Sequence, residues 1–140
     1  MLMMCQSVNW VHGQDVKKRW DFTDSLIFRV SPSAFPSLPK NIVKYLESEG
    51  YTVPQCWYDT VPRNVISGSF RKVGQKDWAV LASHDGSSTI LVFWGGSEKA
   101  PDRLATLSDT NFLRSTGQGN IAFSRIIGLA DKTLDRKSVV

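Results

Sequence analysis

This chain of 140 residues contains only two histidines that could act in acid–base or nucleophilic catalysis, His12 and His84. A hydrolytic triad needs a serine or cysteine within hydrogen-bond reach of an imidazole that a third side chain orients. Ser83, His84 and Asp85 are consecutive, and side chains adjacent along an extended strand point to opposite faces of the sheet. We therefore expect no catalytic residue among them and place His84 and Asp85 at a hairpin tip, as candidates for ligand binding.

The cysteines and carboxylates show no pattern that would hold a metal ion. Cys5 and Cys56 are isolated rather than paired as CxxC, so a zinc site would need both histidines from remote positions. We expect thiols rather than a disulfide, with Cys56 packed as a small apolar side chain. Carboxylates that are close in sequence, such as Asp102 and Asp109, are interpreted as solubilising surface residues. The sequence predicts no metal and no cofactor.

Five tryptophans make the aromatic side chains the most unusual feature of the composition. Trp57 and Tyr58 lie in a segment bounded by two prolines, and aromatic side chains on loops can stack on sugars, bases or proline-rich peptides. The pattern is equally consistent with a core position for these two residues. The other tryptophans are expected in the core, namely Trp10, Trp20, Trp78 and Trp94. Trp57, Tyr58, His84 and Asp85 are thus the predicted ligand-binding residues.

The charge is modestly positive, with 17 Lys and Arg against 13 Asp and Glu and a net charge of +4. The densest basic group is Lys17–Arg19, followed by Arg71–Lys72 and Arg136–Lys137. A protein that binds duplex nucleic acid usually neutralises about six or more phosphates from one face. Basic residues scattered in this way are more typical of a solvated surface. Nucleic-acid binding stays open as an alternative function.

Apolar residues make up 41% of the chain and charged residues 21%, which is typical of a folded protein and not of a disordered tail. The length fits a single domain over residues 1–140. No stretch approaches about eighteen apolar residues, so no membrane insertion is expected. The apolar run Met1–Cys5 is too short for a secretory signal. The localisation stays open between the cytoplasm and export after removal of a signal.

The clearest element is a helix over Leu38–Glu49. Apolar side chains recur in it every four residues, at Leu38, Ile42 and Leu46. Ser37 is the expected N-cap, because its hydroxyl can accept from a backbone N–H of the first turn. Gly50 offers the left-handed conformation that ends a helix, and Tyr51 follows as the usual apolar contact.

A β-meander is expected between residues 64 and 94. Its three strands are Asn64–Phe70, Trp78–Ser83 and Ser88–Trp94, joined by a turn at Arg71–Lys76 and by an Asp-Gly hairpin turn at His84–Ser87. Residues 89–94 are apolar on both faces, which predicts a central strand covered from both sides. The helix is the natural cover for one of these faces.

The remaining segments are less regular. Short strands are expected at Ser25–Val30 and Asn120–Leu129, an ordered loop at residues 51–63, and a second helical segment near residues 101–110 or 130–137. The predicted fold class is α+β, an antiparallel sheet of four to six strands with one or two packed helices.

The meander also carries a family resemblance. Residues 68–81 and 88–95 contain the pattern G-x-F…GQ-x-DWAVL…ILVFW, which resembles an uncharacterised family of small bacterial proteins that are often exported. That resemblance implies a shared fold and no known activity. The chain is also similar, more weakly, to an FG-GAP-type propeller blade, whose loop carboxylates bind calcium. Here the matching loop is the basic segment Arg71–Lys76 followed by Asp77 alone, so calcium is not expected.

With no catalytic constellation, the sequence favours a non-enzymatic binding or interaction module. The alternatives are a hydrolase with an unrecognised site and a nucleic-acid binder. The expected partner is a protein or a small molecule. A homodimer through a sheet edge is a further expectation, because an edge strand exposes unpaired N–H and C=O groups.

Overall fold

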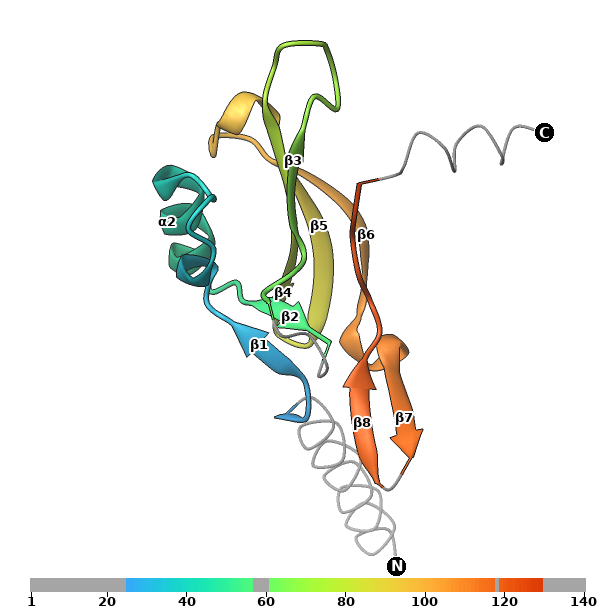
Figure 1. Cartoon of the computed structure of the whole chain (residues 1–140). Coiled ribbons are helices and arrows are strands. Elements are labelled where there is room, and N and C mark those ends of the chain that lie inside the picture. Colours follow the sequence, from blue (N-terminus) through green and yellow to red (C-terminus); the bar gives the residue numbers. More distant parts are fainter. Residues whose placement is uncertain (1–24, 57–60, 118, 130–140) are drawn as a thin grey trace, which may run out of the picture.

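The computed structural model describes residues 25–56, 61–117 and 119–129 (Figure 1). Eight short or medium strands, one α-helix and three 3₁₀ helices follow one another in these ranges. In chain order they are β1 Phe28–Val30, η1 Pro32–Ala34, α2 Lys40–Ser48, β2 Val53–Gln55, β3 Val65–Gly68, β4 Asp77–His84, β5 Ser87–Phe93, η2 Trp94–Gly96, β6 Asp102–Ser108, η3 Asp109–Phe112, β7 Leu113–Gly117 and β8 Asn120–Phe123.

The strands form three antiparallel sheets. The largest has four strands in the order β3-β4-β5-β6, and two-stranded sheets are formed by β1 with β2 and by β7 with β8. The fold is therefore α+β with a four-stranded antiparallel sheet, as the sequence predicts. The meander is confirmed too, because β3, β4 and β5 are consecutive neighbours.

Helix α2 covers one face of the four-stranded sheet (Figure 1). Ile42 and Leu46 on the helix are fully buried, and they belong to one apolar cluster with side chains of β4 and β5. Burial of each such aliphatic side chain stabilises the fold by roughly 1.5–3 kcal/mol. The sheet side chains in this cluster are Trp78, Val80, Ala82, Leu91 and Phe93.

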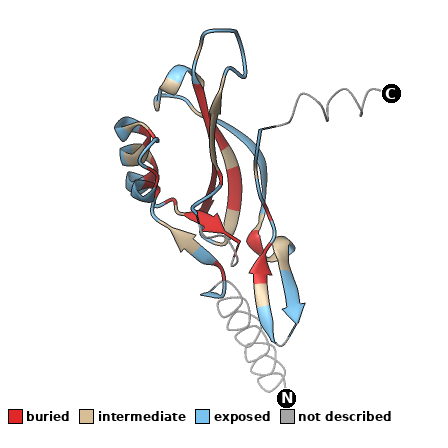
Figure 2. Ribbon diagram, viewed as in Figure 1, coloured by how far each residue is buried: buried red, intermediate tan, exposed pale blue. Residues whose placement is uncertain are grey.

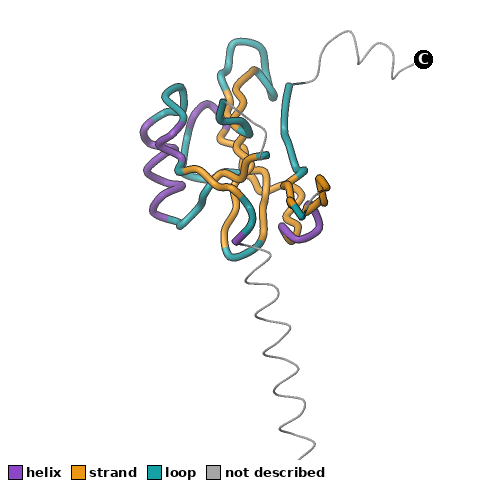
Figure 3. The backbone as a smooth tube through the Cα atoms, turned by 60° about the horizontal axis from the view of Figure 1, so that its bottom comes forward, coloured by secondary structure: helices purple, strands orange, loops and turns teal. Residues whose placement is uncertain are grey.

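The opposite face of the sheet is covered by segments from both ends of the described chain. Leu81 on β4 packs with Ile27 and Phe123, both of which are buried. Figure 3 shows α2 and the β7–β8 hairpin on opposite sides of the strands. Side chains of both inner strands are thus buried on two faces (Figure 2), which confirms the predicted double cover of the sheet centre.

Only one of the two ends of α2 has the cap that the sequence predicts. Ser37 is not the N-cap: the helix begins after Pro39, and no side chain caps it. The C-terminal end follows the prediction. The N–H of Gly50, at φ +79°, donates to the Glu47 carbonyl at 3.1 Å, and the N–H of Tyr51 donates to the Leu46 carbonyl at 2.8 Å. This pair of bonds is a complete Schellman motif.

The helix expected near residues 101–110 is wrong, because this segment is the edge strand β6. Leu104 and Leu107 suggested a helix by their spacing of three. In the structure a bulge lies between them, and Ala105 has a φ of +51°. A bulge adds one residue to a strand, so two side chains that are three residues apart can point to the same face of the sheet. Leu104 accordingly pairs with Ile90, and Leu107 pairs with Ser88.

Other expected boundaries also change. The loop expected at residues 51–63 contains the buried strand β2, which pairs with β1. The strands expected at Ser25–Val30 and Asn120–Leu129 are shorter, at Phe28–Val30 and Asn120–Phe123. The alternative helix at 130–137 lies outside the described residues, as do His12 and Cys5. Across the described ranges, no helix has the length and apolar character needed to cross a bilayer.

Candidate functional site

The hairpin that joins β4 to β5 turns through Asp85 and Gly86. Both residues have positive φ, at +49° and +77°, and His84 pairs with Ser87 on either side of them. Two consecutive residues of positive φ define the tight turn that Asp-Gly favours, because its twist matches that of the flanking strands. The predicted hairpin tip is therefore confirmed, and it fixes where His84 and Asp85 lie.

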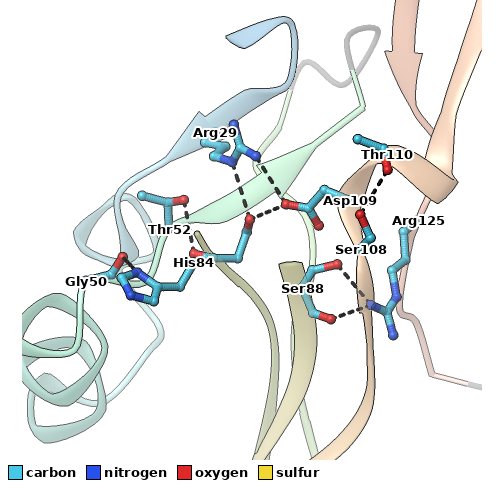
Figure 4. Close-up of polar contacts among 10 residues, drawn as sticks. Arg29, Gly50, Thr52, His84, Ser88, Ser108, Asp109, Thr110 and Arg125 are labelled. Atoms are coloured by element: carbon cyan, nitrogen blue, oxygen red, sulfur yellow. Dashed lines mark hydrogen bonds and ion pairs between the residues drawn. The ribbon is translucent and has the colours of Figure 1, made fainter. Parts of the chain in front are cut away.

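His84 is held by the end of helix α2. Its Nδ1 lies 3.0 Å from the carbonyl oxygen of Gly50 (Figure 4). Its ring packs edge to face with the ring of Tyr51, and the two ring centroids are 5.7 Å apart. Its Nε2 lies 3.1 Å from a carboxylate oxygen of Asp85. Each ring nitrogen thus faces an oxygen acceptor. The Schellman motif that ends α2 also places the carbonyl that orients His84.

Ser83, the preceding residue, turns toward other partners. Its hydroxyl donates to Oδ2 of Asp109 at 2.5 Å. Arg29 approaches the same pair, with Nη2 3.1 Å from Asp109 Oδ2 and Nε 3.4 Å from Ser83 Oγ (Figure 4). Ser83 and His84 therefore contact different groups, as expected for consecutive residues of a strand.

Asp109 links the β1–β2 sheet to the four-stranded sheet. It lies at the start of η3, between β6 and β7, and it is fully buried. Its N–H donates to the Gly86 carbonyl at 2.9 Å, while its side chain meets Arg29 of β1 and Ser83 of β4. The interpretation of Asp109 as a surface residue is wrong. The other member of that carboxylate pair, Asp102, lies at the far end of β6 and accepts from the Trp94 indole at 2.8 Å.

A second arginine approaches the same junction from the segment after β8. Arg125 is buried and donates to the Ser88 carbonyl at 2.7 Å, to the Ser88 hydroxyl at 2.9 Å and to the Ala105 carbonyl. Burial lowers the pKa of the Arg125 guanidinium, and attraction to Asp109 opposes this shift. Oδ1 of Asp109 is buried and has no hydrogen-bond partner in the described part of the chain.

A surface pocket of about 300 Å³ opens beside this junction. It contains groups that donate hydrogen bonds, such as Arg29 and Thr52, and groups that accept them, such as Asp85 and the Gly50 carbonyl. The pocket is thus suited to a polar group that both donates and accepts. Its lining residues are Arg29, Gly50, Thr52, Ser83, His84, Asp85 and Gly86.

Another buried carboxylate, Asp77, lies at the opposite end of β4. It accepts hydrogen bonds from the N–H groups of Phe70, Arg71 and Gly95 and from the Gln75 amide, at 2.6–3.3 Å. Burial alone would raise the pKa of Asp77, but these hydrogen bonds outweigh it and hold the pKa below its ordinary value. Asp77 thus ties the β3–β4 loop, residues 69–76, to η2.

The structure brings together two of the four predicted ligand-binding residues, since His84 and Asp85 share the pocket rim. Trp57 and Tyr58 lie outside the described residues. Sequence reasoning missed Arg29 and Thr52, and no local motif marks either of them. Cys56 is buried, with Sγ 2.8 Å from the Phe123 carbonyl oxygen, as expected of a small packed side chain.

No three His, Cys, Asp or Glu side chains of the described ranges are grouped closely enough to hold a metal ion. Comparisons with protein-family models, with curated proteins and with solved structures found no match. The assignment of a function therefore depends on the geometry of the pocket.

Proposed function

We propose that this chain is a non-enzymatic binding module and that the pocket beside the β4–β5 turn is its ligand site. The observation that supports this most is the convergence of His84, Asp85, Arg29 and Thr52 on one pocket. These side chains come from separate elements and are positioned by a buried junction and a helix terminus. Concave sites with a few convergent polar groups are the usual places for ligands.

The charges in the pocket favour a neutral polar ligand. Arg29 is paired with Asp109, and His84 lies beside Asp85, so neither sign of charge dominates. A charged ligand would lose its hydration without gaining an opposite charge of its own. An amide or a hydroxyl, as a peptide or a sugar carries, can both donate and accept here. We therefore infer that the ligand presents such a group.

The hydrolase alternative has less support. Ser83 precedes His84 in the sequence, but its hydroxyl donates to Asp109, while His84 contacts Gly50 and Asp85. A serine nucleophile needs a base that can take its proton, which is usually an imidazole. A screen of ester and phosphoester substrates is expected to show no turnover. Turnover that Ser83→Ala abolishes would establish the hydrolase instead.

The proposal can be tested by ligand-observed NMR with three small probes of similar size. Acetamide is expected to bind saturably, and acetate and ethylammonium more weakly. His84→Ala is expected to abolish acetamide binding, because it removes one wall of the pocket. Thr116→Ala, at an exposed position of β7, is the control and leaves binding unchanged. Binding that survives His84→Ala, or a preference for either charged probe, would contradict the proposal.

A further inference from the structure

The β3–β4 loop projects beyond the end of the sheet, far from the pocket (Figure 1). Val73 is 99% exposed, and Phe70 is exposed as well. Val73 thus presents its whole apolar side chain to water at the tip of the loop. Nothing in the pocket function requires this arrangement, because the pocket lies at the other end of β4.

The same loop carries three cations and no acid. Arg71, Lys72 and Lys76 are all exposed, and none of them forms an ion pair with another described residue. Arg71 lies over the Trp94 ring at 5.5 Å, and Lys76 lies over the Trp78 ring at 4.9 Å. Two of the cations are thus placed by aromatic rings while their charge stays uncompensated.

The shape of the loop is fixed from inside. The single carboxylate next to it, Asp77, is buried and takes hydrogen bonds from two loop N–H groups and from Gln75. The Asp77 carboxylate accepts hydrogen bonds from the loop backbone and forms no ion pair with the exposed cations. Both ends of the loop are therefore fixed to Asp77, which reduces the backbone entropy that is lost when the loop meets a partner.

We propose that the β3–β4 loop binds the surface of an anionic lipid bilayer. Val73 enters the interface between headgroups and acyl chains, and Arg71, Lys72 and Lys76 contact the lipid phosphates. An apolar side chain surrounded by cations matches the two attractions of such a surface, namely apolar burial and the negative surface potential. The contact is peripheral and made by a loop.

Several observations favour lipid over nucleic acid. The apex of the loop carries the exposed apolar side chain of Val73, which the interface of a bilayer can bury and a nucleic-acid backbone cannot. The rings of Trp94 and Trp78 lie under Arg71 and Lys76, so these faces are closed to stacking with bases. The loop has three cations, whereas a protein that binds duplex nucleic acid usually contacts about six or more phosphates.

The test is co-sedimentation of the full chain with vesicles. One set contains phosphatidylcholine alone, and the other contains phosphatidylcholine and phosphatidylglycerol in equal parts. The chain is expected to bind the second set, and added salt is expected to weaken the binding. Each loop cation contributes about fivefold to partitioning, so Lys72→Gln with Lys76→Gln is expected to lower it about 25-fold. Lys40→Gln removes one charge from the exposed surface of α2 and is the control. It is expected to change partitioning by less than about twofold.

A second variant tests the apolar contact without risk to the fold. Val73→Ser is expected to lower partitioning by up to about tenfold, because it removes an apolar side chain from the interface. Val61→Ser, at a residue that is also exposed, is the matched control and leaves partitioning unchanged. Equal binding to both vesicle sets, or no binding, would overturn the proposal. Binding of a DNA or RNA oligonucleotide that the double variant abolishes, in a chain that ignores vesicles, would assign the loop to nucleic acid instead.

Discussion

Asp77 and Asp109 are both fully buried, and each organises one end of strand β4. Asp77 collects hydrogen bonds from a loop, whereas Asp109 meets an arginine and a serine from other sheets. A buried carboxylate is costly unless its charge is compensated in this way. The two residues therefore give separate predictions for stability.

The stability supplied by Asp77 depends on pH. Folding lowers the pKa of Asp77 below 3.8, so its contribution is complete above that value and is lost as the pH falls through the folded-state pKa. Asp77→Asn is expected to be less stable than wild type at neutral pH. The difference is expected to shrink under acid conditions, measured as the urea midpoint against pH. Parallel curves for the two proteins would refute this role.

Asp109 is expected to matter at neutral pH through its ion pair. Asp109→Asn removes the charge that Arg29 and Ser83 both contact, and breaking a buried pair from one side costs about 3 kcal/mol of unfolding free energy. Such losses run from about 3 to about 5 kcal/mol, and we expect the lower value because the Arg29 side chain is 19% exposed. Asp85→Asn, at a carboxylate that is 87% exposed, is the matched control and is expected to change stability by less than about 0.5 kcal/mol. Equal effects of the two substitutions in urea unfolding would show that the junction adds nothing.

At the scale of elements, the end of α2 controls the pocket. Gly50 has a φ of +79°, and a Cβ added there would lie 3.0 Å from Cε1 of His84. Gly50→Ala is therefore expected to cost about 1 kcal/mol of stability and to displace the imidazole. The check is the urea midpoint together with the NMR resonances of His84 and the affinity for acetamide.

Gly119 offers a control with the same backbone strain. It also has a φ of +79°, but nothing lies within 4 Å of an added Cβ. Gly119→Ala is expected to cost a similar free energy and to leave His84 and acetamide binding unchanged. If both variants displaced His84, the strain itself and not the contact with Gly50 would be responsible.

The elements that the sequence predicts well are those with local signals. The period of Ile42 and Leu46, followed by Gly50, indicates α2, and the Asp-Gly pair indicates the β4–β5 turn. The sequence of β6 resembles that of a helix, because a bulge at Ala105 gives apolar side chains of the strand the spacing of one helical turn. A bulge depends on the neighbouring strand, so the segment's own residues do not reveal it.

On the scale of the molecule, the sequence predicts His84 and Asp85 at the site but not the side chains that complete it. Arg29 and Asp109 are 80 residues apart in the chain and meet only because β1 packs beside the end of the four-stranded sheet. No periodicity or motif relates two such positions. The same holds for Asn64, whose amide group lies 3.5 Å from the carbonyl oxygen of Arg125 at a separation of 61 residues.

In the described part of the chain, the two surfaces that we propose for binding lie at opposite ends of β4, the polar pocket at one end and the basic loop at the other. A map of backbone-amide NMR shifts during titration with acetamide tests the pocket most directly. We predict saturable shifts confined to the pocket-lining residues Arg29, Gly50, Thr52 and 83–86, with no change in residues 69–76. Shifts that centre on the β3–β4 loop, or no saturable shift at all, would contradict the assignment of the ligand site.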